Sequence, residues 1–74
     1  MTNLELALAV MVPGREYTSA EIMRKVWPDG WRTSTQRYNL QSRITAALTT
    51  AAKYGIVERV GTTATGGKIW RLPA

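Results

Sequence analysis

The sequence contains no cysteine and no histidine among its 74 residues. Without cysteine the chain can form no disulfide, no thiolate metal site and no cysteine nucleophile. Without histidine it lacks the commonest general base and metal ligand, and its five acidic residues form no dense cluster that would replace it. We therefore expect no enzyme, no metal and no cofactor, and we favour a binding protein.

The sequence also lacks a long hydrophobic run. The longest, residues 6–13, is too short to span a bilayer, and no cleavage-site pattern follows it. A secretory signal begins with a basic stretch, whereas Glu5 is the only charged side chain before Arg15. We expect a cytoplasmic protein without a membrane partner. A length of 74 residues and a hydrophobic content of 45% suit one small folded domain, residues 1–74.

Two capping boxes predict the starts of two short helices. Thr2 is followed three residues later by Glu5, and Thr18 by Glu21, a spacing at which each side chain bonds a free backbone N–H of the first turn. The first helix should run from Asn3 to about Met11, and the second should have about eight residues and end before the proline at position 28. The apolar residues at helical spacing are Leu4, Ala7, Leu8 and Met11 in the first helix, and Ile22, Met23 and Val26 in the second.

The longest predicted helix lies in the middle of the chain. Thr33, Ser34 or Thr35 can cap its start, and no proline or glycine interrupts it up to Tyr54. Gly55 is suited to end it in a left-handed conformation. Its expected buried stripe consists of Leu40, Ile44, Ala47, Leu48 and Ala51.

The end of the chain changes from helical to strand-like patterning. Residues 56–60 and 68–72 are β-prone runs separated by a loop rich in glycine and threonine, which predicts a β-hairpin with a long loop. A short extended stretch is expected earlier, at residues 15–17. Alternation places Trp70 on a buried strand face. The tryptophans at positions 27 and 31, in the connector before the long helix, are expected to pack over the core rather than stack on unpaired bases or anchor a partner.

The order of these elements is helix, short strand, helix, connector, long helix and hairpin. In residues 15–22 (REYTSAEI), 53–60 (KYGIVERV) and 69–72 (IWRL), the chain resembles the winged helix-turn-helix family of DNA-binding domains. The resemblance covers the whole chain. It implies an α+β fold, a three-helix winged helix-turn-helix with a short first strand and a C-terminal β-hairpin wing, as in small stand-alone bacterial, archaeal or phage regulators. The connector, residues 27–33, is longer than the turn of a plain helix-turn-helix.

Positive charge is unevenly distributed along the chain. Ten Lys and Arg against five Asp and Glu give a net charge of +5. Residues 1–29 hold three basic and four acidic side chains, whereas residues 30–74 hold seven basic side chains and one acidic. The excess therefore belongs to the long helix and the hairpin, the elements that a winged-helix protein places in the major groove and along the backbone. A basic excess that serves only solubility is the competing interpretation.

The face of the long helix opposite its buried stripe is polar and uncharged. By helical spacing it holds Thr35, Tyr38, Ser42, Thr45 and Thr49, with Asn39 and Ala46 beside them. Asparagine pairs with adenine, arginine with guanine, and hydroxyls with bases or phosphates. An ordinary solvated helix face is the alternative for each residue. In the N-terminal half, the candidates for base contacts are Gln36, Arg37, Tyr38, Asn39 and Ser42.

A second set of residues is suited to phosphate contacts. Arg43 lies on a flank of the long helix, and Lys68, the strongest single candidate, adjoins the glycines of the hairpin loop. Threonine hydroxyls and glycine amides of that loop can also bond phosphate oxygens, although any exposed hairpin tip has this composition. The predicted phosphate contacts are Arg32, Thr35, Arg43, Arg59, Thr63, Lys68 and Arg71.

Residues 61–69 superficially resemble a phosphate-binding P-loop. That motif requires lysine directly after its second fixed glycine, then serine or threonine, and then a helix. Here Gly67 separates Gly66 from Lys68, Ile69 replaces the hydroxyl residue, and a strand is expected to follow. We therefore reject nucleotide hydrolysis.

Two functional hypotheses follow. The first is a small transcriptional regulator that binds double-stranded DNA sequence-specifically, with a homodimer on a two-part site as the route to useful affinity. The second is a winged-helix protein-interaction module, an assembly subunit or a phage protein that binds a host protein without binding DNA; the uncharged centre of the long helix favours it. Single-stranded nucleic acid is a weaker third hypothesis, because aromatic and basic residues do not alternate. The target sequence, the direction of regulation and the oligomeric state stay open.

Overall fold

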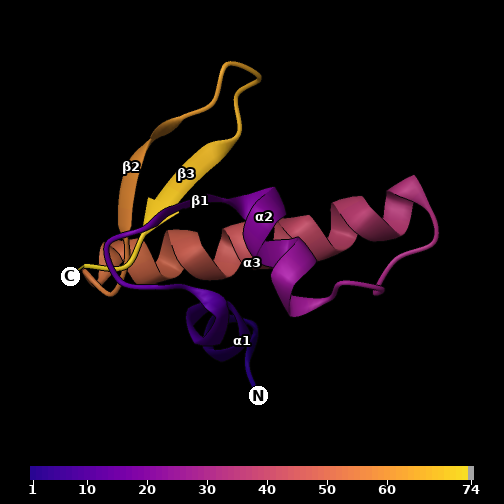
Figure 1. The fold of residues 1–74 in the computed structure, drawn as a ribbon, viewed down its shortest axis with the longest axis horizontal. Helices are drawn as coiled ribbons and strands as arrows, with labels where there is room; N and C mark the ends of the chain where they lie inside the picture. The colour runs from indigo at the N-terminus through magenta and orange to yellow at the C-terminus, as the bar shows by residue number, and fades with distance from the viewer. Residues whose placement is uncertain (74) are drawn as a thin grey trace.

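The computed structural model describes residues 1–73, which form three α-helices and a three-stranded antiparallel sheet (Figure 1). β3 lies in the middle of the sheet, between β1 and β2. The α+β class predicted from the sequence is therefore confirmed. In chain order the elements are α1 (Asn3–Val10), β1 (Glu16–Thr18), α2 (Ser19–Val26), α3 (Ser34–Lys53), β2 (Glu58–Thr62) and β3 (Lys68–Arg71).

Side-chain caps fix the starts of these helices. Both predicted capping boxes form, at Thr2 for α1 and at Thr18 for α2, and α2 has the predicted eight residues. α3 is capped by Thr33, rather than by Ser34 or Thr35. Because a cap satisfies backbone N–H groups that have no partner within the helix, each start is determined locally.

The end of α3 explains where the hairpin begins. Gly55 has a φ of 74°, the left-handed conformation predicted for it. The N–H of Ile56 donates to the carbonyl of Ala51 at 3.0 Å, and the N–H of Gly55 donates to that of Ala52 at 3.2 Å, the pair of bonds that defines a Schellman motif. Since Ile56 closes the helix, β2 begins at Glu58 rather than at the predicted residue 56.

The hydrophobic core lies between the helices and the inner face of the sheet. The three predicted apolar stripes supply most of it, and Trp70 is 1% exposed, as its strand position predicted. Trp27 and Trp31 pack against the core, which confirms the structural interpretation of the connector tryptophans. The buried hydrophobic residues of the described chain are Ala7, Met11, Tyr17, Ile22, Met23, Ile44, Leu48, Ala51, Val57 and Trp70.

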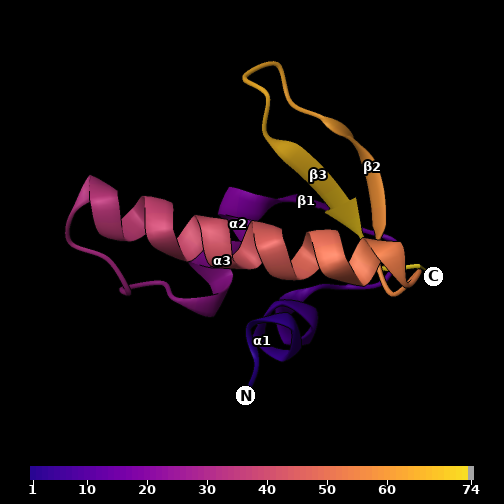
Figure 2. The same cartoon turned by 180° about the vertical axis from the view of Figure 1, so that it is seen from behind.

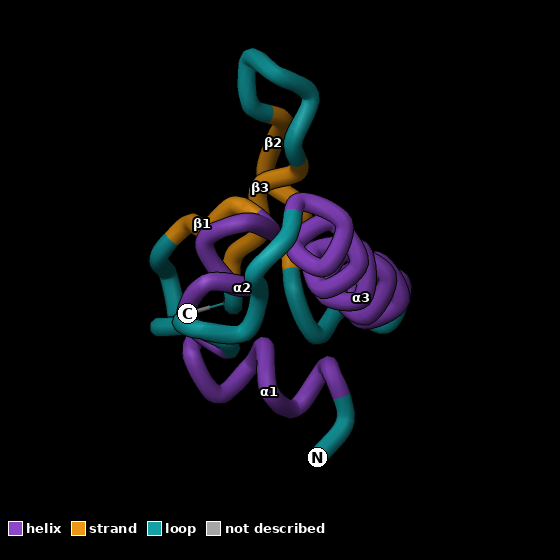
Figure 3. The backbone as a smooth tube through the Cα atoms, turned by 90° about the vertical axis from the view of Figure 1, so that its right-hand side faces the viewer, coloured by secondary structure: helices purple, strands orange, loops and turns teal. Residues whose placement is uncertain are grey.

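α3 has another element beside it on each of three sides. The hairpin and α1 lie on opposite sides of it in both face views (Figures 1 and 2). Figure 3, which looks nearly along α3, shows α2 on a third side, so that the fourth side faces outward. The start of α3 extends beyond the core, and residues 32–39 are all exposed. Neither α3 nor another helix in residues 1–73 is long and apolar enough to cross a membrane.

Candidate functional site

The sheet separates the basic residues of the hairpin onto two faces. Opposed residues on paired strands point to the same side, and the register pairs Arg59 with the buried Trp70. Lys68, two residues before Trp70, shares this inner face. Arg59 and Lys68 therefore point to the side of the sheet that packs on the helices, whereas Arg71 lies on the outer face.

Arg71 is paired with a carboxylate on that outer face. Its Nε and Nη2 atoms donate to Oε2 of Glu58 at 3.0 and 2.5 Å, and the register also places it opposite Glu16. The hydrogen bond to Glu58, and then the charge of Glu58, raise the pKa of Arg71 above its ordinary value. The guanidinium that the sequence suggested for phosphate contact is thus already bonded to a carboxylate and points away from α3.

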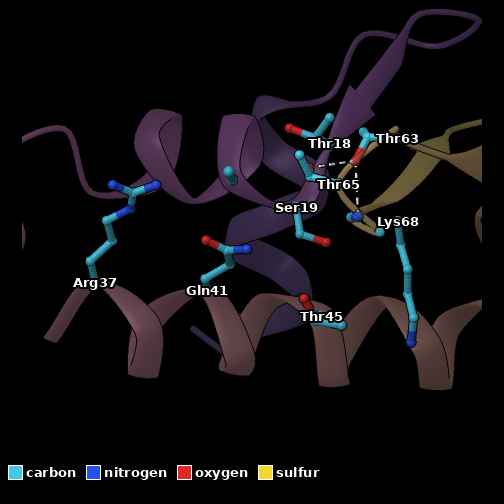
Figure 4. A pocket seen from close by; sticks show the side chains of 11 residues that line it. Thr18, Ser19, Arg37, Gln41, Thr45, Thr63, Thr65 and Lys68 are labelled. Atoms are coloured by element: carbon cyan, nitrogen blue, oxygen red, sulfur yellow. Dashed lines mark hydrogen bonds between the residues drawn. The ribbon is translucent and has the colours of Figure 1, made fainter. Parts of the chain in front are cut away.

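A groove runs between α3 and the inner side of the hairpin. One part is a hollow of about 430 Å³ beside the start of α2 (Figure 4). The second part continues along α3 from Lys68, which lines both parts. On α3 the lining residues are spaced four apart, so they form a row about 24 Å long that winds gradually around the helix. We name this feature the α3–hairpin groove; its walls are formed by Arg37, Gln41, Thr45, Thr49 and Lys53 on α3, and by Arg59, Thr63, Thr65 and Lys68 on the hairpin.

The α3–hairpin groove is lined by charge of one sign. Arg37 and Lys53 contribute cations from α3, and Arg59 and Lys68 contribute cations from the hairpin. None of the residues that line these two hollows, all within the described part of the chain, is acidic. In Figure 4, Lys68 reaches toward α3 while Arg37 stands at the other end of the hollow. A concave surface with one sign of charge concentrates ions of the opposite sign, so the groove suits a polyanion.

The outward side of α3 next to this groove is uncharged. Five residues on it are exposed, and Tyr38 is 72% exposed. Thr45 and Thr49, which the sequence assigned to the same face, are instead half-buried at the groove, and the Oγ1 of Thr49 donates to the carbonyl of Thr45 at 2.7 Å. We name the outward residues the exposed strip; they are Thr35, Tyr38, Asn39, Ser42 and Ala46.

Gln36 and Arg43 lie on the other flank of α3. At about 100° per residue, Arg43 is rotated by about 200° from the groove residue Thr45, so it points away from the hairpin. Gln36, seven residues before Arg43, shares that flank. The Oε1 of Gln36 accepts the backbone N–H of Arg32 at 2.7 Å, so this amide takes part in the start of the helix. Arg43 thus gives the exposed strip a basic border on the side opposite the groove.

Thr63 holds the hairpin loop closed. Its N–H donates to the carbonyl of Gly67 at 2.7 Å, and its Oγ1 accepts the N–H of Gly67 at 2.9 Å. The same Oγ1 lies 3.2 Å from the Oγ1 of Thr65. A Cβ added at Gly67 would lie 3.1 Å from this oxygen, so a larger residue here would require Thr63 to shift by a few tenths of an ångström. Thr63 lines the groove, but its hydroxyl is also bonded within the loop, to Gly67.

Sequence reasoning missed four α3 residues of the groove as site candidates. Gln41, Thr45, Thr49 and Lys53 follow Arg37 at intervals of four residues, a spacing that places consecutive members next to each other in a row that winds around the helix. That signal was present in the sequence. Which face the hairpin covers was not, because it depends on how residues far apart in the chain pack together.

The comparisons with known proteins supply no relative. No family model, no curated protein and no solved structure matches this chain. Across residues 1–73, no group of three or more acidic, histidine or cysteine side chains is placed to hold a metal ion. The function must therefore be argued from the groove and the exposed strip.

Proposed function

We propose that the chain is a winged helix-turn-helix protein that binds double-stranded DNA in a sequence-dependent way, as a small transcriptional regulator. In this arrangement α3 lies in the major groove, and the β2–β3 hairpin is the wing that contacts the phosphate backbone. The α3–hairpin groove is the observation that carries the proposal, because four cations from two separate elements converge there without a carboxylate.

The charge around α3 favours a duplex over a smaller anion. The groove cations border the exposed strip on one side, and Arg43 borders it on the other. The major groove is about 12 Å wide, admits one α-helix and is edged by the phosphates of both strands. When α3 lies in the major groove, its uncharged strip therefore contacts the base edges, and its two basic borders contact the phosphates. Phosphate contacts position such a protein, and base contacts give specificity.

The salt dependence of binding tests this proposal. Affinity for a mixed-sequence duplex would be measured by fluorescence anisotropy at salt concentrations from about 50 to about 200 mM. If each of the four groove cations and Arg43 neutralises one phosphate, the slope of log K against log salt is about −4.5. The absence of duplex binding at the lowest salt concentration would overturn the proposal.

A protein-interaction module is the second candidate function. Tyr54 is 77% exposed and Ile56 is 42% exposed, and they flank Gly55 at the end of α3. Tyrosine is enriched at protein interfaces, where its ring buries a large area. If this candidate is correct, duplex binding is absent at low salt, and replacing Tyr54 with serine reduces binding to the protein partner without unfolding the chain.

A further inference from the structure

The arginines of α3 lie outside the exposed strip. Arg37 points into the α3–hairpin groove, and Arg43 lies on the opposite flank. Bidentate pairing of arginine with O6 and N7 of guanine is the commonest specific contact in the major groove. Because neither guanidinium belongs to the outward face, the strip has no arginine for bidentate pairing with guanine.

Among the residues of the strip, Asn39 alone carries both a donor and an acceptor on one planar group. Thr35, Ser42 and Tyr38 offer single hydroxyls, which bond more than one base, and Ala46 offers a methyl group. Asn39 is exposed, and within residues 1–73 its amide enters no recorded hydrogen bond. It is therefore free to pair with a ligand.

Adenine matches the asparagine amide, and guanine does not. In the major groove adenine presents the N6 donor beside the N7 acceptor, so the amide oxygen accepts from N6 and the amide nitrogen donates to N7. Guanine presents two acceptors, N7 and O6, and one of them would face the amide oxygen. We infer that Asn39 is the specificity-determining residue and that it selects adenine. This inference rests on the proposed function, and it makes the target a duplex with an A·T pair opposite the start of α3.

Selection from a pool of random duplexes, followed by affinity measurements, tests the inference. The wild-type chain should enrich one adenine position. Replacing that adenine with 7-deazaadenine, which lacks the N7 acceptor, should weaken binding about tenfold, within the range of one good bidentate pair. Asn39→Ala should reduce the preference for adenine over guanine to about one. Because Asn39 is exposed and alanine favours helix, this variant should keep the fold, which circular dichroism checks.

Asn3→Ala is the matched control, since it makes the same chemical change on α1, on the side of α3 away from the hairpin. It should leave the adenine preference unchanged. Duplex binding that shows no adenine preference, or that tolerates 7-deazaadenine fully, overturns the inference and leaves the proposed function standing. Absence of any duplex binding at low salt overturns both.

Discussion

Two basic residues of β3 show how strand position decides what a side chain can do. Lys68 and Arg71 are three residues apart, so alternation places them on opposite faces of the sheet. Lys68 lines the α3–hairpin groove, whereas Arg71 bonds Glu58 on the outer face. The separation could be read from the sequence. That the face of Lys68 continues into a basic groove could not, because α3 supplies the other wall.

Replacing these two residues tests the docking face. Lys68→Ala should weaken duplex binding about equally for all sequences and reduce the salt slope by about 0.9, because one phosphate contact is lost. Arg71→Ala removes the same charge from the same strand and serves as the control; affinity should stay within about twofold. If Arg71→Ala proved the more damaging substitution, the outer face of the sheet would be the binding surface.

Ser19 and Trp70 form the buried polar contact of the described core. The Nε1–H of Trp70 donates to the Oγ of Ser19 at 2.8 Å, and the two residues are 1% and 4% exposed. The bond joins the first residue of α2 to the central strand. It is therefore part of how the sheet is held against the helices.

Ser19→Ala should destabilise the fold by about 1–3 kcal/mol, because the buried indole N–H would lose its partner. The free energy of unfolding in urea measures the effect. Ser42→Ala makes the same change on the exposed strip, where the cost should stay within about 0.5 kcal/mol. Equal stabilities for the two variants would show that the indole finds another acceptor.

Among the helices, α3 depends unusually on its cap. Its first turns extend beyond the core, and most helices of proteins owe their stability to packing rather than to their own hydrogen bonds. What holds this start is Thr33, whose Oγ1 accepts the N–H of Gln36, and Gln36, whose Oε1 accepts the N–H of Arg32. The segment that would enter the major groove is thus held mainly by local bonds.

Thr33→Ala should lower the free energy of opening the first turns of α3 by about 0.5–2 kcal/mol, because the cap is lost. The loss should appear as faster hydrogen exchange at the amides of residues 36–39, with little change at the buried part of the helix. Thr50→Ala, at an exposed position in the last turn of α3, is the control and should leave those rates unchanged. Faster exchange throughout α3 would mean that the helix opens as one unit.

Over the whole molecule, the fold brings positive charges close together, and their repulsion lowers its stability. The protein has a net charge of +5, and four of its cations lie along one groove. In the free protein these cations repel one another. Salt screens this repulsion, since the Debye length falls to about 10 Å at 0.1 M. The groove is therefore expected to affect stability as well as binding.

Thermal melting of the free protein should show this effect. The Tm should rise by roughly a few degrees between low and moderate NaCl concentrations, opposite in direction to the effect of salt on DNA affinity. An Arg59→Gln and Lys53→Gln double variant removes two groove cations, and its Tm should respond less to salt. An identical response in the double variant would show that the groove cations do not repel one another appreciably.

The sequence determined the helices and most of the hairpin, because their signals are local. Capping pairs span three residues and buried stripes span one or two turns, so the start at Thr18, the stripe through Ile44 and the turn at Gly55 could each be predicted. The same helical period predicted the outward position of Thr35, Tyr38 and Ser42, but it wrongly added Thr45 and Thr49, which are half-buried at the groove. The boundary of β2 was misplaced because Ile56 closes α3 instead of starting the strand.

Only the tertiary structure decided which cations meet. Arg37 and Lys68 line one hollow although 31 positions separate them, and the irregular register between Arg59 and Gly61 fixes which side chains of β2 face inward. Such placements depend on how the sheet packs on the helices, including the bond between Ser19 and Trp70. No pattern of neighbouring residues encodes that packing, because its free energy comes from contacts between distant segments.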